Sequence, residues 1–104
     1  MAGPDELIHQ SLRLRIMAAL YAAQQVEPLD FTRLKAIVGA TDGNLGSHLT
    51  TLETAGYVRI EKDFAGRKPR TRALITARGA TAFRDHTNYL REIIEAALPD
   101  IPPG

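Results

Sequence analysis

The apolar residues in the first quarter of the chain recur with a helical period but occupy more than one face of a helix. They are Leu7, Ile8, Leu12, Leu14, Ile16, Met17, Leu20 and Tyr21. A surface helix needs only one apolar stripe, about 100° wide. The pattern therefore predicts a helix over residues 5–25 that packs one face on its own core and another against a second chain.

Two shorter helices are predicted after Pro28 interrupts the first. Asp30 can cap a helix over residues 31–38, which Gly39 can end, and Thr41 can cap a third helix. The side chains expected to face the core are Phe31, Leu34, Ile37 and Val38 in one helix and Leu45, Leu49 and Leu52 in the other. The short connection between them has the spacing of a helix-turn-helix.

A β-hairpin and a long helix are predicted for the rest of the chain. Apolar and charged residues alternate over Tyr57–Asp63, as expected for a half-buried strand, and Arg70–Ile75 is the expected partner strand. The loop between them is predicted over Phe64–Pro69. Thr76 can cap a last helix over residues 77–98. The predicted order is α-α-α-β-β-α, a mainly α fold with a small hairpin.

Length and composition limit the classes of protein that the chain can represent. With 104 residues it has room for one domain, which we place at residues 1–98, followed by a C-terminal tail at 99–104. It has no cysteine, which excludes disulfides and cysteine-based zinc sites. No segment approaches the roughly 20 apolar residues of a membrane span, so we expect a cytoplasmic protein with no membrane partner.

Catalytic and metal-binding patterns are weak. No nucleophile elbow, phosphate loop or paired-carboxylate motif is present, so we expect no enzyme. Polar residues of the last predicted helix (Asp85, His86, Glu92 and Glu95) do not share one face. We therefore interpret them as solvated surface residues and expect neither a metal site nor a cofactor.

Charge is unevenly distributed although the net charge is only +1. From Arg59 to Arg78 there are seven basic residues against two acidic ones, a local excess of +5. Such an excess favours a polyanionic partner, because binding relieves the mutual repulsion and releases counterions. The tip of the predicted hairpin carries Arg67, Lys68 and Arg70.

The third predicted helix has short polar side chains on the face opposite its leucines. These are Asn44, Ser47, His48 and Thr51, with Thr41 at the helix start. Short hydrogen-bonding groups allow a helix to approach base edges closely. Gly43 and Gly46 each cost about 1 kcal/mol relative to Ala in a helix, which suggests close approach of DNA or of a neighbouring helix. The alternative is an ordinary solvated amphipathic helix.

Three stretches of the chain resemble small winged-helix transcriptional regulators of bacteria and archaea, relatives of the MarR and ArsR groups. They are LRLRIMAAL (12–20), DFTRLKAIVGATDGNLGSHLTTLETAGYV (30–58) and KDFAGRKPRTRALITARGATAF (62–83). The resemblance implies a winged helix-turn-helix that works as a homodimer, with the third helix in the major groove of double-stranded DNA and the hairpin as the wing. By this resemblance the groove-facing positions are Thr41, Asn44, Ser47, His48 and Thr51, and the wing contacts are Arg67, Lys68 and Arg70. Gly46 departs from the pattern, since relatives often carry a polar residue there.

The last predicted helix has its own apolar repeat. Phe83, Leu90, Ile94 and Ala97 recur at near-heptad spacing, with Ile93 and Leu98 beside them. In a domain of this size, a helix of this length has little intrachain core left to cover. We therefore expect the terminal helices (residues 5–25 and 77–98) to pair with those of a second copy. The expected interface residues are Leu7, Ile8, Leu14, Tyr21, Leu90, Ile93, Ile94 and Ala97. Packing of the last helix back onto the first is the alternative.

Taken together, these patterns indicate a sequence-specific regulator of transcription that binds double-stranded DNA as a homodimer, with repression as the expected mode. Two alternatives stay open. One is a winged-helix protein-interaction module without DNA binding, and the other is a regulator that responds to a small ligand or a metal. The sequence does not indicate the operator, the regulated genes or an effector.

Overall fold

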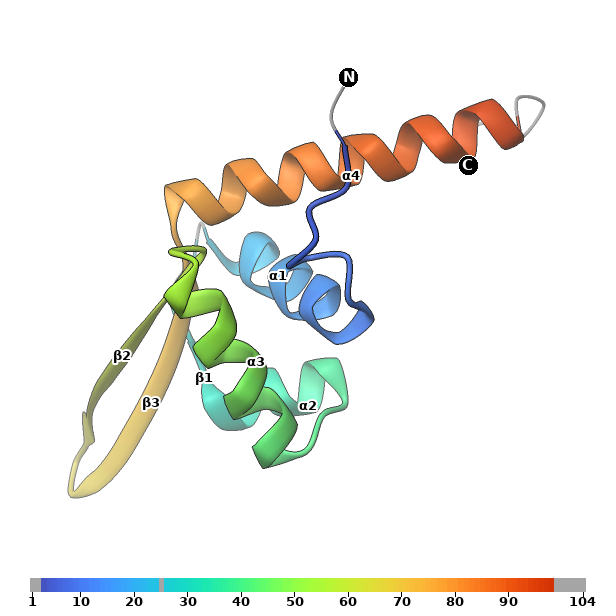
Figure 1. Ribbon diagram of the computed structural model, residues 1–104. Helices are drawn as coiled ribbons and strands as arrows, with labels where there is room; N and C mark the ends of the chain where they lie inside the picture. The colour runs from blue at the N-terminus through green and yellow to red at the C-terminus, as the bar shows by residue number, and fades with distance from the viewer. Residues whose placement is uncertain (1–2, 25, 99–104) are drawn as a thin grey trace.

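The computed structural model describes residues 3–24 and 26–98. In this part of the chain four helices surround one end of a small three-stranded antiparallel sheet, from which a long hairpin projects (Figure 1). The elements are α1 (Ser11–Ala23), β1 (Leu29–Asp30), α2 (Phe31–Val38), α3 (Asp42–Thr54), β2 (Val58–Ala65), β3 (Lys68–Ile75) and α4 (Ala77–Ala97). The predicted tail at 99–104 lies outside the described residues.

Three predicted helix caps are confirmed, and they determine where α2, α3 and α4 begin. The side chain of Asp30 accepts a hydrogen bond from the backbone N–H of Arg33, Thr41 accepts one from Asn44, and Thr76 accepts one from Gly79. Each satisfies one of the free N–H groups of a first helical turn. Gly39 ends α2 with a φ of 67°, a left-handed conformation that glycine adopts without strain.

The prediction for the first helix is wrong at its start. α1 begins at Ser11, with Gln10 as its cap, and residues 6–9 form a turn. The carboxylate of Asp5 accepts hydrogen bonds from the backbone N–H groups of Leu7 and Ile8, at 2.9 and 3.1 Å. An aspartate that binds nearby N–H groups favours a turn over continued helix. The apolar residues before Ser11 therefore reach the core from a turn.

The sheet contains a strand that the sequence analysis does not predict. β1 pairs with β3, with Leu29 opposite Ala73 and Asp30 opposite Arg72, so the strand order is β1-β3-β2. A strand of two residues is too short to leave an alternating pattern. The hairpin is also longer than predicted, because its strands extend through most of the predicted loop as far as a turn at residues 66–67.

One apolar core holds the helices against the base of the sheet. Its buried residues are Ile8, Leu12, Ile16, Met17, Leu20, Leu34, Val38, Leu45, Leu49, Leu52, Val58, Ala73, Ile75 and Ala80. The inward positions predicted for α3 are confirmed. In α2, Ile37 is exposed and Phe31 only half-buried, because a helix of eight residues presents just a narrow stripe to the core.

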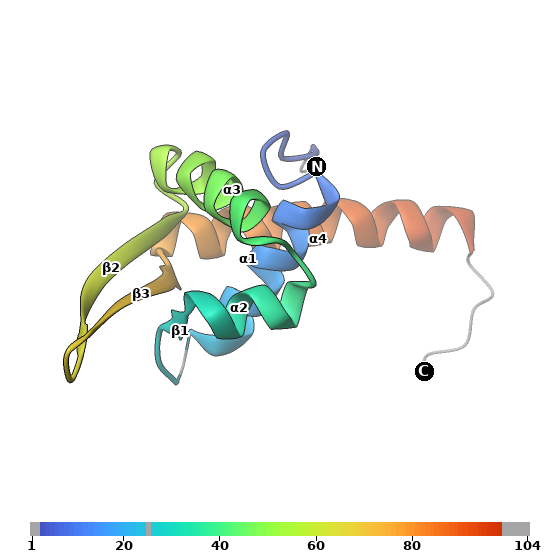
Figure 2. The ribbon, with the colours of Figure 1, turned by 90° about the horizontal axis from the view of Figure 1, so that it is seen from below.

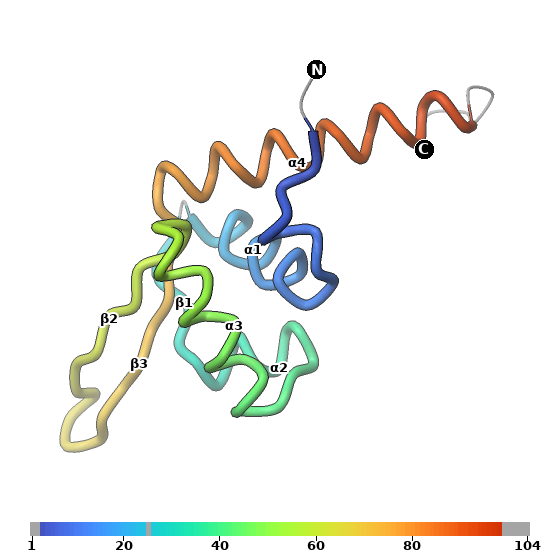
Figure 3. Tube along the Cα trace, in the orientation of Figure 1, coloured from blue at the N-terminus to red at the C-terminus, as the bar shows by residue number. Residues whose placement is uncertain are grey.

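Only the first half of α4 packs against the rest of the chain. Gly79 and Ala80 near its start are buried, and Gly79 lies against the carbonyl group of Tyr57, the residue before β2. In contrast, Ile93, Ile94 and Leu98 near its end are 47%, 55% and 51% exposed. Figure 3 shows the second half of α4 projecting beyond the other helices, and the molecule measures 55 × 27 × 26 Å. The alternative, packing of the last helix back onto the first, therefore holds for the first half of α4 and not for the second.

Candidate nucleic-acid interface

The outer face of α3 carries most of the side chains predicted to face DNA. Asn44 and Ser47 are exposed, and Thr51 is half-buried. Thr41 is exposed at the helix start, where its Oγ1 accepts the N–H of Asn44 at 3.2 Å. The first turn of α3 thus presents its remaining N–H groups to solvent, an arrangement that suits a phosphate.

Thr50 and Thr54 belong to the same outer face and were missed by the sequence analysis. At 100° per residue they lie nearly opposite Leu45, Leu49 and Leu52, and both are exposed. Their hydroxyls donate to backbone carbonyls four residues earlier, at 3.0 and 2.9 Å. Each hydroxyl oxygen therefore remains available as an acceptor. The helical period of the leucines was the signal that could have placed them.

The side chain of His48 is less exposed than predicted, and one of its ring nitrogens already has a hydrogen-bond partner. Its ring is half-buried, and its Nδ1 accepts a hydrogen bond from Arg13 Nε of α1 at 3.0 Å. Arg13 also donates to the backbone oxygen of Leu7 at 3.4 Å. His48 therefore joins α3 to α1 and to the N-terminal turn, and only its Nε2 remains for another partner.

The two glycines of α3 do not contact another helix. A Cβ atom added to Gly43 or Gly46 would meet nothing within 4 Å among the described residues. Close packing between helices of one chain, one of the two explanations considered from the sequence, is therefore wrong. Both glycines lie on an open face of α3, as expected for a solvated helix or for one that a partner approaches closely.

The basic residues of the hairpin differ in how strongly they are held. Within residues 3–24 and 26–98, neither Arg67 nor Lys68 pairs with an acidic side chain, and both are exposed at the turn. Arg70, predicted to act with them, instead forms two hydrogen bonds with Asp63, at 2.9 and 2.8 Å. The hydrogen bond from Arg70 lowers the pKa of Asp63, so this carboxylate stays charged at neutral pH.

Further acid–base pairs lie along the hairpin towards its base. Arg72 lies 3.2 Å from Asp63 and 4.0 Å from Glu61, and Arg59 lies 3.8 Å from Glu61. The two acids of the basic segment thus oppose Arg59, Arg70 and Arg72. The unopposed charge of the hairpin is concentrated at its tip.

A hollow of about 580 Å³ separates α3 from the hairpin. Thr50 and Glu53 line it from α3, and Lys62 and Thr71 line it from the strands. Lys62 is exposed and pairs with no acidic side chain in the described part of the chain. The sequence analysis did not name Lys62 as a contact residue, although strand alternation places it on the face opposite Glu61 and Asp63.

The residues predicted for a dimer interface fall into three groups. Ile8 is fully buried in the core of one chain, so its side chain is not available to a second copy. Leu7, Leu14, Tyr21 and Leu90 are half-buried, and Tyr21 packs on Phe83 with ring centroids 5.0 Å apart. Ile93, Ile94 and Ala97 are exposed on the projecting half of α4.

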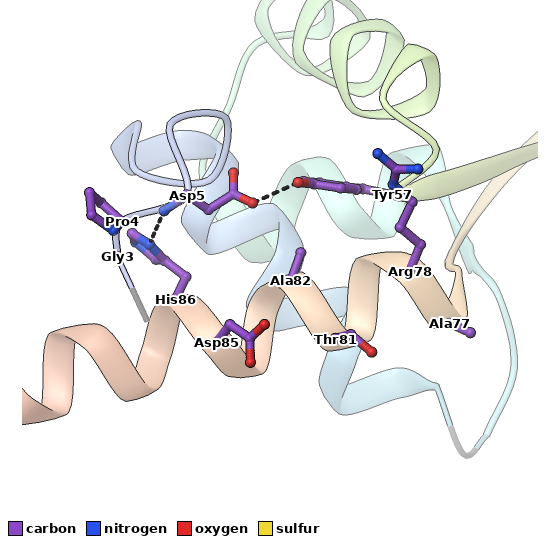
Figure 4. A pocket seen from close by; sticks show the side chains of 10 residues that line it. All are labelled: Gly3, Pro4, Asp5, Tyr57, Ala77, Arg78, Thr81, Ala82, Asp85 and His86. Carbon is purple, nitrogen blue, oxygen red and sulfur yellow. Dashed lines mark hydrogen bonds between the residues drawn. The ribbon is translucent and has the colours of Figure 1, made fainter. Parts of the chain in front are cut away.

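A hydrogen-bonded network joins the N-terminal segment to α4 and to Tyr57, the residue before β2 (Figure 4). The backbone N–H of Asp5 donates to His86 Nδ1 at 3.0 Å, and the Tyr57 hydroxyl donates to the carboxylate of Asp5 at 2.6 Å. Burial and the hydrogen bond to Asp5 raise the pKa of Tyr57 to about 12, so its hydroxyl remains a donor. His86 is 1% exposed, which corrects its interpretation as a solvated residue. These residues line a hollow of about 650 Å³.

The described residues contain neither a candidate metal cluster nor a candidate membrane span. No group of three or more His, Cys, Asp or Glu side chains there is placed to hold a metal ion. No helix in that part of the chain combines the length and apolarity needed to cross a membrane.

A helix-turn-helix followed by a β-hairpin with free cations at its tip defines a winged helix, and the predicted fold class is confirmed. The sequence profile of the winged helix DNA-binding domain matches residues 12–94. An uncharacterised protein of Methanocaldococcus jannaschii is 34% identical over 90 residues, which cover 86% of this chain and 91% of the relative. The chain therefore belongs to the winged helix DNA-binding domain family.

Solved structures of transcriptional regulators have the same fold. The structure of a transcriptional regulator homologue from Pyrococcus horikoshii OT3 superposes with a TM-score of 0.82 and 29% identity, over 93% of this chain and 91% of the other. The S. aureus MepR–DNA complex superposes with a TM-score of 0.72 and 18% identity, over 91% and 78%. These similarities confirm the resemblance to small winged-helix DNA-binding regulators that the sequence indicated.

Proposed function

We propose that this protein is a sequence-specific regulator of transcription that binds double-stranded DNA as a homodimer and represses by covering a promoter. The observation that carries the proposal is the juxtaposition of two features. The exposed face of α3 is built from small polar side chains, and the hairpin beside it carries at its tip Arg67 and Lys68, which pair with no acid among residues 3–24 and 26–98. One duplex can contact both.

In this proposal α3 enters the major groove. Asn44, Ser47 and Thr51 contact base edges. Beside them, Thr50 and Thr54 offer hydroxyl oxygens as hydrogen-bond acceptors and methyl groups for apolar contact. Thr41 and the first turn of α3 anchor a phosphate, and His48 contributes through Nε2. MepR of S. aureus, which has the same fold, has been solved as a complex with DNA.

The hairpin serves as the wing. Arg67 and Lys68 contact phosphates or the minor groove, because they are exposed and have no acidic partner in the described part of the chain. Arg70 contributes from within its pair with Asp63, which holds the guanidinium in place and leaves its side chain 37% exposed. A pre-paired arginine adds less to the salt dependence of binding than a free one.

The exposed apolar half of α4 is the proposed dimer contact. Leu90, Ile93, Ile94 and Ala97 lie on it, and an intermolecular bundle would bury them. A two-fold dimer would set the two copies of α3 against half-sites about 34 Å apart, one turn of the duplex. Leu7, Leu14 and Tyr21 would border this contact.

The test is selection of bound duplexes from a random pool, followed by binding titrations across a potassium chloride series. We expect a preferred sequence with two half-sites and an affinity that falls steeply with salt, by a log–log slope of about −0.9 for each phosphate contacted. Absence of binding to any duplex in dilute buffer, with the protein folded, would contradict the proposal. A protein-interaction role would then be the better explanation of the fold.

A second candidate function is regulation by a small ligand, and the hollow beside His86 favours it. Asp5, Tyr57, Arg78 and Asp85 line this hollow of about 650 Å³ together with the buried histidine. A ligand there would touch both α4 and the start of the wing. Calorimetry with small aromatic acids and divalent cations tests the idea, and it fails if no compound binds and DNA affinity does not change.

A further inference from the structure

One large apolar side chain of the hairpin is almost uncovered. Phe64 is 68% exposed, and it lies directly across the sheet from Pro69, which is also exposed. Alternation along β2 places Phe64 on the same face as Ile60 and Lys62, the face that lines the hollow beside α3. Phe64 therefore extends the surface that α3 and the wing form together.

The two faces of the hairpin differ in their chemistry. On the opposite face Glu61 and Asp63 pair with Arg59, Arg70 and Arg72, so these three arginines are held by acidic partners. On the face of Phe64 lies Lys62, and Arg67 and Lys68 follow at and just after the turn; none of these three cations has an acidic partner among the described residues. An apolar pair with such cations nearby is complementary to a polyanion that also offers apolar surface.

The hairpin is long and narrow enough to reach such a partner. β2 has eight residues, which span about 23 Å at the usual rise of a strand. The minor groove next to a bound major groove lies half a helical turn away, about 17 Å along the duplex. It is about 6 Å wide, which excludes a helix but leaves room for single side chains that project from a hairpin tip. Figure 2 shows the tip extending away from all four labelled helices.

We propose that Phe64 and Pro69 form an apolar wedge that enters the minor groove flanking the site of α3, while Arg67 and Lys68 hold the adjoining phosphates. The proposal rests on the DNA-binding function above. Apolar side chains in minor grooves contact sugars and base edges and partly unstack flexible steps. The wedge thereby makes affinity depend on the sequence and shape of bases that α3 does not touch.

The first experiment uses the absence of tryptophan from this chain. The variant Phe64→Trp carries a single tryptophan emitter at the wedge. We expect its fluorescence to change and its quenching by acrylamide to fall when a selected duplex binds, with saturation followed independently by the anisotropy of labelled DNA. Unchanged quenching at saturation would overturn the wedge.

The second experiment separates apolar contact from charge. Phe64→Ala should weaken binding by at least about tenfold, as expected for loss of a buried phenyl group, and leave the salt slope unchanged. Val26→Ala, at another exposed apolar position outside the hairpin, should leave the affinity unchanged. Wild-type affinity in Phe64→Ala would overturn the proposal even though the protein still binds DNA.

A third experiment addresses the groove itself. Replacing guanosine by inosine in the flanks removes the amino group of the minor groove and leaves the major groove intact. We expect the wild type to bind such duplexes more tightly than guanosine ones, and Phe64→Ala to lose this discrimination. Equal discrimination by both proteins would overturn the wedge. If the wild type binds no duplex, the proposed function itself fails and the wedge fails with it.

Discussion

The acidic residues of the hairpin decide which of its basic side chains are free. Asp63 accepts two hydrogen bonds from Arg70 and one from Arg72, so these arginines are oriented by the protein. Arg67 lies beyond the last acid, at the turn. At the scale of single residues, position relative to an acid therefore matters more than the number of positive charges.

The variant Arg67→Ala tests this distinction. Loss of one free cation should flatten the log–log dependence of DNA affinity on salt by about 0.9 per copy, because one fewer counterion is released. An Arg67→Ala slope equal to that of the wild type would contradict the wing assignment.

His86 makes the stability of the folded protein depend on pH below neutrality. Burial, and then the neighbouring ring of His9, lower the pKa of His86 below its usual value of 6.5, while Asp5 and Glu6 act in the opposite direction. The folded state therefore favours the neutral ring, whose Nδ1 accepts the Asp5 N–H. The resulting stability is present above pH 6.5 and is lost as the pH falls through the lowered value.

We expect the melting temperature of the wild type to fall between pH 7 and pH 5 more than that of His86→Asn. The asparagine oxygen can accept the Asp5 N–H and does not titrate in this range. Thermal melts followed by circular dichroism at several pH values give the comparison. An equal fall in both proteins would mean that other groups carry the acid sensitivity.

Among the elements, those whose ends depend on local chemistry were predicted best. The caps Asp30, Thr41 and Thr76 mark the starts of α2, α3 and α4, and the leucines of α3 mark its buried face. The start of α1 was wrong because Asp5 binds Leu7 and Ile8 in a turn. β1 was missed because its two residues are a strand only by virtue of their pairing with β3.

The junction between α4 and the wing depends on a glycine. A Cβ at Gly79 would collide with the carbonyl group of Tyr57 and lie 3.0 Å from Ile75 Cγ1. Gly79→Ala should lower the free energy of unfolding by about 3 kcal/mol or more, because backbone rather than a flexible side chain obstructs the methyl group.

Gly46→Ala is the control for this prediction, since the same methyl group would meet nothing there within 4 Å. It should raise the free energy of unfolding by up to about 1 kcal/mol through helix propensity. Chemical denaturation of both variants provides the measurement. Similar stabilities of the two variants would refute the close contact at Gly79.

At the scale of the whole molecule, part of the apolar surface of α4 is left uncovered. α4 has 21 residues, yet only its first half is covered by the rest of the chain, and the exposed isoleucines lie on the other half. Burial of such side chains contributes roughly 2 kcal/mol each, which favours a second copy over exposure to water. The proposed dimer follows from this uncovered half.

The variant Ile94→Glu should shift the protein from dimer to monomer in light scattering and weaken binding to a duplex with two half-sites. Ile37→Glu is the matched control, because Ile37 has the same exposed fraction of 55% but lies on α2. It should remain dimeric. A monomeric wild type, or an Ile94→Glu dimer of unchanged stability, would refute the proposed contact.

Local patterns in the sequence were sufficient for the four helices, the two strands of the hairpin, most helix boundaries, the buried face of α3 and the concentration of positive charge at the hairpin. These depend on interactions between residues close together in the chain, which period and capping reveal. Tertiary structure alone decided that Ile8 and His86 are buried, that His48 is held by Arg13 and that, among the described residues, Arg70 has an acidic partner while Arg67 has none. Some of these contacts join residues that are far apart in sequence, and such pairs produce no periodic pattern. In the hairpin, several basic residues are spaced so that each could pair with the same acid, and only the folded chain determines which of them does.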